Sequence, residues 1–175
     1  MCVIVDANSL SSVFNPTDEY HEDFQPVYDW IIKGKGKLIM GGTHYNKEIS
    51  KCRKYLKIIN VLKKQSKVYT ADSEKVDQLE ADIRSKIPDP DFDDPHLPAI
   101  AIVGKCKVIC SRDTRSIKFV TSPCLYPNKI SIPKYYCSRR NISLLSDKYI
   151  HSFHKPLNSF NKATILQVSQ LIHDI

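Results

Sequence analysis

Four short apolar runs, separated by longer stretches of helical periodicity, place the strongest constraint on how this chain can fold. The runs are CVIV at 2–5, KLIM at 37–40, KVYT at 67–70 and KVIC at 107–110. Short, continuous apolar runs bounded by turn residues are typical of strands buried on both faces of a parallel sheet. The alternation therefore predicts an α/β fold with a central, mainly parallel β-sheet flanked by helices.

The segments between these runs predict helices over about 18–33, 44–64, 73–87 and 95–103, with Ser73 as a possible N-cap of the third. The stretch IPDPDFDDP at 87–95 contains three prolines, which fix φ and remove hydrogen-bond donors, so we expect a loop there. Further prolines interrupt the pattern after residue 122. We expect one short strand at 130–132 and a final helix over about 161–173.

The length of 175 residues is sufficient for one domain with its own hydrophobic core, and we expect residues 1–175 to form a single domain. Residues 1–120 would be its core and 121–175 a variable C-terminal extension of it. The apolar start MCVIV ends after five residues and lacks a positively charged flank, and no later stretch reaches eighteen apolar residues. We therefore expect a soluble, cytoplasmic protein without a membrane span. The six cysteines show no zinc-finger spacing, which indicates reduced thiols.

The charge distribution favours partners that carry phosphate. Twenty-six lysines and arginines against nineteen acidic residues give a formal net charge of +7. The basic residues are spread over 33–67 and 105–155, whereas acidic residues concentrate at 18–29 and 89–94. A basic protein with compact acidic segments is the pattern expected of a metal site within a surface that attracts phosphates.

Four acidic residues stand where a metal site would need them: Asp6 after the first strand, Glu48 near the start of a helix, Asp94 directly before a helix and Asp113 after the fourth strand. Taken singly, each has an ordinary interpretation as a loop residue, a helix-dipole partner or an N-cap. The carboxyl ends of parallel strands, however, lie at one edge of the sheet. Several carboxylates that meet there repel each other unless a hard divalent cation lies between them.

The same residues lie in segments that resemble the motifs of the PIN-domain nucleases. These segments are VIVDANSL at 3–10, GGTHYNKEI at 41–49, DDPHLPAIAI at 93–102 and VICSRDTRSI at 108–117. The resemblance covers roughly the first 120 residues, and the four segments have the order and spacing of that family's motifs. The family includes toxin-type ribonucleases. It implies a Rossmann-like three-layer PIN fold and a Mg²⁺ or Mn²⁺ site at the carboxyl edge of the sheet.

By motif match, the metal-binding and catalytic acids would be Asp6, Glu48, Asp94 and Asp113, with Asp93 as an alternative to Asp94. The resemblance also implies that Asn8 and Ser111 support these acids without binding the metal.

Basic residues near the last acid and in the C-terminal region are candidates for substrate binding. Arg112 and Arg115 could clamp a backbone phosphate. Lys134, Arg139 and Arg140 are interleaved with Tyr135 and Tyr136, a pattern that fits either base stacking on exposed rings or, more commonly, tyrosines used in packing. The histidines at 44, 96, 151 and 154 are interpreted as surface or hydrogen-bonded, partly buried residues, because an oxygen-only Mg²⁺ site does not need them.

The function predicted on this basis is metal-dependent hydrolysis of RNA by an endoribonuclease, as a toxin of a toxin–antitoxin pair or another defence effector. The expected partners are RNA, an antitoxin protein and a second copy of the chain. The alternative is a catalytically inactive PIN-like scaffold that binds RNA or protein, against which the presence of all four acids argues. Receiver domains and Asp-x-Asp phosphatases are disfavoured, because Asp6-Ala7-Asn8 supplies neither arrangement of acids.

Overall fold

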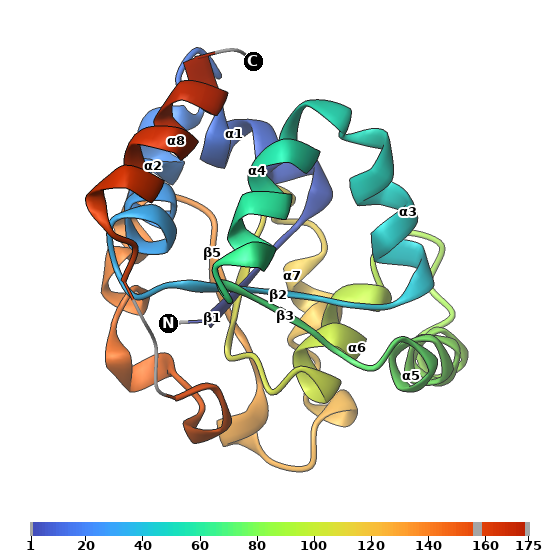
Figure 1. Cartoon of the computed structure of the whole chain (residues 1–175). Coiled ribbons are helices and arrows are strands. Elements are labelled where there is room, and N and C mark those ends of the chain that lie inside the picture. Colours follow the sequence, from blue (N-terminus) through green and yellow to red (C-terminus); the bar gives the residue numbers. More distant parts are fainter. Residues whose placement is uncertain (1, 156–158, 174–175) are drawn as a thin grey trace.

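The computed structural model describes residues 2–155 and 159–173 (Figure 1). Within them, the strands are β1 (Cys2–Val5), β2 (Lys37–Met40), β3 (Val68–Thr70), β4 (Val108–Cys110) and β5 (Lys134–Tyr136). In these described residues the strands form one five-stranded sheet in the order β3-β2-β1-β4-β5, and each neighbouring pair is parallel. The predicted α/β fold with a central parallel sheet flanked by helices is confirmed.

Helices cover the sheet from both sides. The α-helices are α1 (Leu10–Phe14), α2 (His21–Ile32), α3 (Thr43–Lys51), α4 (Arg53–Lys64), α5 (Ser73–Lys86), α6 (His96–Val103), α7 (Ile117–Val120) and α8 (Lys162–His173). Figure 1 shows α1, α2, α4 and α8 on one side of the sheet and α5 and α6 on the other. Short 3₁₀ helices are η1 (Ala7–Ser9), η2 (Pro123–Leu125), η3 (Lys129–Ser131), η4 (Arg139–Leu144), η5 (Asp147–Tyr149) and η6 (Ser152–His154).

The helix predicted over 44–64 is two helices, because the backbone leaves the helical region at Cys52, with φ −84° and ψ 54°. Continuous apolar spacing along the segment concealed this break. The break lets each half bury its own residues: α3 buries Tyr45 and Ile49 near the carboxyl end of β1, while α4 buries its apolar face against the core. The separate direction of α3 is what carries Glu48 toward the sheet edge.

Two smaller predictions are wrong. The N-cap of α5 is Asp72, not Ser73, because the Asp72 carboxylate accepts a hydrogen bond from Lys75 N at 3.2 Å. The strand expected at 130–132 lies instead at 134–136, directly after Pro133, and residues 129–131 form the 3₁₀ helix η3. The loop at 87–95 and the final helix are confirmed, with α8 covering 162–173.

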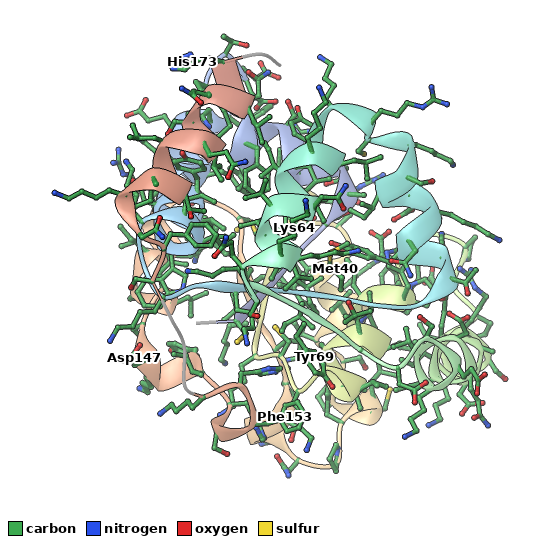
Figure 2. The ribbon with its side chains drawn as sticks, in the orientation of Figure 1. Met40, Lys64, Tyr69, Asp147, Phe153 and His173 are labelled. Atoms are coloured by element: carbon green, nitrogen blue, oxygen red, sulfur yellow. The ribbon has the colours of Figure 1, made fainter. Side chains whose placement is uncertain are left out.

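The described residues after 120 belong to the same hydrophobic core as the first 120. Strand β5 completes the sheet, and α8 packs against α4. Tyr69 in β3 and Phe153 in η6, both labelled in Figure 2, meet edge to face with their ring centroids 5.4 Å apart. In the described parts of the chain, no helix combines the length and apolar character needed to cross a membrane.

Candidate functional site

Asp6 and Ser111 lie side by side because they directly follow paired residues of two neighbouring strands. In the parallel pair β1–β4, Val5 is aligned with Cys110, and Asp6 N donates to Cys110 O at 2.9 Å. Ser111 Oγ donates to Asp6 Oδ2 at 2.6 Å and accepts from Asp113 N at 3.0 Å. This hydroxyl therefore connects the Asp6 carboxylate with the backbone N–H of Asp113, the last of the four predicted acids.

The Asp6 side chain is almost completely enclosed, with 2% of the residue exposed. Burial raises the pKa of its carboxyl group, and the negative charge of Glu48 adds to that effect. The hydrogen bond from Ser111, and another from Asn8 N at 3.3 Å to Oδ1, act in the opposite direction. A buried carboxylate held by two donors is rigid and has a defined orientation.

Glu48 reaches the same region because α3 begins at a glycine in an unusual conformation. Gly42 has φ +79°, and a Cβ built on it would lie 2.6 Å from Val76 Cγ1, so another residue would be both strained and in collision. Two residues after Thr43, the buried Tyr45 donates its hydroxyl to Val5 O at 2.5 Å, which fixes α3 at the end of β1. Glu48 lies one turn further along α3.

The Glu48 carboxylate lies between two histidines. Its Oε2 is 3.4 Å from His96 Nε2, and its Oε1 is 3.5 Å from His44 Nε2. The contact with His96 lowers the pKa of Glu48, and the positive charge that both histidines can carry adds to this. One nitrogen of each imidazole therefore lies within 3.5 Å of the Glu48 carboxylate.

Asp94, rather than Asp93, lies in the acidic cluster. Asp93 is exposed and Asp94 is half-buried. The pKa of Asp94 is raised to about 6, mainly by burial and also by the negative charges of Asp6, Glu48 and Asp113, while His96 acts in the opposite direction. The electrostatic influence of the other three acids on Asp94 means that all four predicted acids lie near one another at this edge of the sheet.

Asp113 differs from the other acids because an arginine of its own loop neutralises it. Arg115 Nε and Nη2 donate to Asp113 Oδ1 and Oδ2 at 3.0 and 2.9 Å, and this pair lowers the pKa of Asp113. Arg115 was predicted to bind a phosphate. In this structure its guanidinium is instead engaged with Asp113, although its side chain remains 82% exposed.

His96 is the residue that the sequence interpretation missed. It is completely buried, and neither ring nitrogen has a hydrogen-bond partner among the described residues, so its interpretation as a surface or hydrogen-bonded histidine is wrong. His154, in contrast, is buried and contacts Gly104 O through Nε2 at 2.7 Å, as that interpretation expected. The signal that was available is the position of His96 two residues after Asp94, in the same DDPHL motif.

The donor set fits a divalent cation. One ligand atom each from Glu48, Asp94 and His96 lie within 4.8 Å of one another. Carboxylate oxygens suit Mg²⁺ and Mn²⁺, while an imidazole nitrogen favours transition metals such as Mn²⁺ or Zn²⁺ over Mg²⁺. Nδ1 of the buried His96, which has neither a hydrogen bond nor an ion-pair contact among the described residues, is an independent indication that a ligand belongs beside it.

A groove of about 530 Å³ runs beside Asp113, lined by Asn8, Glu19, Tyr20, Arg112, Asp113 and Arg115. The Arg112 guanidinium lies over the Tyr20 ring, 4.9 Å from its centroid, and Nη2 donates to Asn8 O at 3.2 Å. Asn8 supports Asp6 through its backbone N–H, while its side-chain oxygen accepts from Ser9 Oγ at 2.8 Å. The groove offers an exposed arginine next to the acidic cluster.

The tyrosines at 135 and 136 do not form a stacking surface. They are 8% and 0% exposed, and their hydroxyls contact Ser116 Oγ and Asp23 O, each at 2.8 Å. The packing interpretation is therefore confirmed for both rings.

The basic residues around these tyrosines are exposed but lie in different places. Lys134 begins β5 and so lies at the amino edge of the sheet, away from Asp6, which follows the carboxyl end of β1. Arg139 lies beyond the carboxyl end of β5, where its backbone N donates to Asp23 Oδ1 at 2.9 Å. Arg140 follows it in η4, and a role for these residues in substrate binding stays a prediction.

Comparisons of the chain with protein-family models, with curated proteins and with solved structures found no match.

Proposed function

We propose that this chain is a metal-dependent endoribonuclease of the PIN type, which hydrolyses phosphodiester bonds of RNA at the cluster of Asp6, Glu48, Asp94 and Asp113. One observation carries the proposal. Acids from four separate segments of the chain gather at the carboxyl edge of a parallel sheet, where Ser111 links Asp6 to Asp113 and where Glu48 and Asp94 flank the buried His96.

A cluster of this kind lowers the stability of the fold unless a cation balances it, since buried like charges repel each other. Mg²⁺ or Mn²⁺ is the proposed cofactor, held by the four acids. When bound, such a cation supplies water of lowered pKa and offsets negative charge that develops on a phosphodiester.

The protein's own residues supply orientation and attraction. The hydroxyl of Ser111 and the backbone N–H of Asn8 hold the Asp6 carboxylate in one orientation. The guanidinium of Arg112, at the groove beside Asp113, is placed to bind a phosphate of the substrate. The formal net charge of +7 attracts a polyanion from a distance, while the local acids select for a cation at the edge of the sheet.

The choice of RNA, a role as a toxin or defence effector, and an antitoxin or a second copy as partner are proposed from the resemblance of the four motifs to PIN-domain nucleases. A second candidate function is a catalytically inactive scaffold that binds RNA or protein. It is favoured by the bidentate pair of Arg115 with Asp113, which leaves one of the four acids already neutralised.

A cleavage assay separates the two functions. Wild type, Asp6→Asn and the exposed control Asp93→Asn would be incubated with end-labelled single-stranded RNA and with single-stranded DNA of the same sequence, in Mg²⁺, in Mn²⁺ and in excess chelator. We expect RNA fragments from wild type and Asp93→Asn with a divalent cation, and at least about a hundredfold slower cleavage by Asp6→Asn. Binding of RNA without cleavage in every condition would support the scaffold instead.

A further inference from the structure

Three side chains next to the acidic cluster form a second group of possible ligands, the His–Glu–His group: His44 on α3, Glu80 on α5 and His96 on α6. One ligand atom of each lies within 4.8 Å of the other two. The group shares His96 with the set of Glu48, Asp94 and His96. The three helices contact one another in pairs, and in Figure 1 they lie in the right half of the molecule, with α6 beside α5. Residues brought together from three helices are held by the tertiary structure and not by local sequence.

The central member of this group lacks the contacts that a buried imidazole normally has. His96 is 0% exposed, and both Nδ1 and Nε2 are without a hydrogen-bond partner in the described residues. Its Nε2 is 3.4 Å from Glu48 Oε2, a charge contact that does not have hydrogen-bond geometry. Nearly all buried polar side-chain atoms in proteins are paired, so an unpaired one indicates a ligand that completes the site.

The other two members of the group, His44 and Glu80, already lie in contact with each other beside His96. His44 Nδ1 lies 2.8 Å from Glu80 Oε1, and the His44 ring centroid is 4.4 Å from that of His96. Solvent reaches the group from the side of His44, because the side chains of His44 and Glu80 are 37% and 15% exposed while His96 is enclosed. An ion could therefore enter along His44 and meet all three side chains.

We propose that His44, Glu80 and His96 form a second cation site, which binds a transition-metal ion of the Zn²⁺ class. Two imidazole nitrogens and one carboxylate oxygen make a donor set that Zn²⁺ accepts with a position left open for water. Imidazole selects such ions over Mg²⁺ and Ca²⁺, which prefer oxygen alone. Binding replaces the His44–Glu80 hydrogen bond by coordination and supplies the partner that His96 lacks.

This site does not depend on the proposed nuclease activity, since neither His44 nor Glu80 belongs to the four acids. Its expected consequence is structural. A bound ion ties α3, α5 and α6 together; α3 carries Glu48, and α6 begins two residues after Asp94. Occupancy would thus hold the two acids on this side of the cluster in place, and it would raise the midpoint of thermal unfolding.

The test is direct measurement of Zn²⁺ binding by titration calorimetry on the full chain under reducing conditions. All proteins would carry Cys124→Ser, which removes an exposed thiol that can also bind zinc. We expect Glu80→Gln, which keeps the shape of the side chain, and His44→Asn to bind Zn²⁺ about tenfold or more weakly than the parent. The matched control Glu74→Gln, on the exposed surface of α5, should bind like the parent.

Asp113→Asn separates this proposal from the proposed function, because it should lose RNA cleavage and keep Zn²⁺ binding. Circular dichroism would establish that each variant is folded, and thermal unfolding with and without Zn²⁺ gives a second measurement. The proposal is overturned if the parent binds no Zn²⁺, or if Glu80→Gln and His44→Asn both bind it as tightly as the parent. Zn²⁺ binding that Asp94→Asn alone weakens would equally overturn it, by placing the ion at the acidic cluster.

Discussion

Replacing Asp94 by asparagine is expected to stabilise the metal-free protein at neutral pH. The pKa of this carboxyl group is raised from 3.8 to about 6, first by burial and then by the negative charges of Asp6, Glu48 and Asp113. Among the residues that the structure describes, the Asp94 carboxylate has charge interactions but no hydrogen bond. Replacing it by an amide therefore breaks no hydrogen bond. The substitution removes the repulsion and keeps the shape of the side chain.

The magnitude follows from the difference in pKa between the folded and unfolded chain. A difference of about 2 corresponds to roughly 3 kcal/mol at about 1.4 kcal/mol for each pKa unit. Because Asp94 is only half-buried, solvent screens part of this, and we expect a gain of roughly 1–2 kcal/mol. The folded protein binds more protons than the unfolded chain between about pH 4 and pH 6, so the stability of wild type falls as the pH rises through that window.

Urea denaturation in the presence of chelator, at about pH 7 and about pH 4, measures this effect. The free energy of unfolding of Asp94→Asn should exceed that of wild type at pH 7, and the difference should largely disappear at pH 4, where the carboxyl group is protonated in the folded protein and partly protonated in the unfolded chain. Asp93→Asn, at the exposed neighbouring position, should match wild type at both pH values. If Asp94→Asn is no more stable than wild type at pH 7, the four acids do not destabilise the fold by mutual repulsion.

Two further predictions concern the supports of the site. Ser111→Ala removes the donor to the buried Asp6 carboxylate and should lower the free energy of unfolding at pH 7 by about 1.5–3 kcal/mol. Chemical denaturation at constant m-value would measure this loss. A loss below about 0.5 kcal/mol would contradict the role given to Ser111. Gly42→Ala places a Cβ at φ +79° against Val76 and should cost at least about 1–2 kcal/mol, seen as a lower thermal midpoint. Gly104→Ala, with an ordinary φ of −78°, separates that conformational strain from simple crowding.

Much of the fold could be predicted because it depends on local patterns. The apolar runs at 2–5, 37–40, 67–70 and 107–110 became β1 to β4 within one residue at each end. The prolines of 87–95 placed the loop before α6 correctly, since proline restricts the backbone wherever it occurs. The break at Cys52 could not be predicted, because it arises from the separate packing of α3 and α4 against different parts of the core.

The same division holds for the site. The four acids could be selected by their positions at strand ends and helix starts, and Ser111 by the resemblance of its segment to a PIN-domain motif. The burial of His96 and its lack of hydrogen bonds could not be predicted, because the sequence of an apolar segment does not show whether the ring nitrogens of a histidine in it have partners. The engagement of Arg115 with Asp113 was equally hidden, since two charges in one loop can face each other or the solvent.

Sequence alone was therefore sufficient for β1 to β4 and for the helices between them, apart from the break at Cys52, because apolar periodicity and backbone restriction act over a few residues. Only the tertiary structure decided which groups share the carboxyl edge of the sheet with the four acids. Helices α3, α5 and α6, far apart along the chain, bring His44, Glu80 and His96 within 4.8 Å of one another. The distances and burial that govern charge and metal binding are set by packing between distant segments, and no local pattern records them.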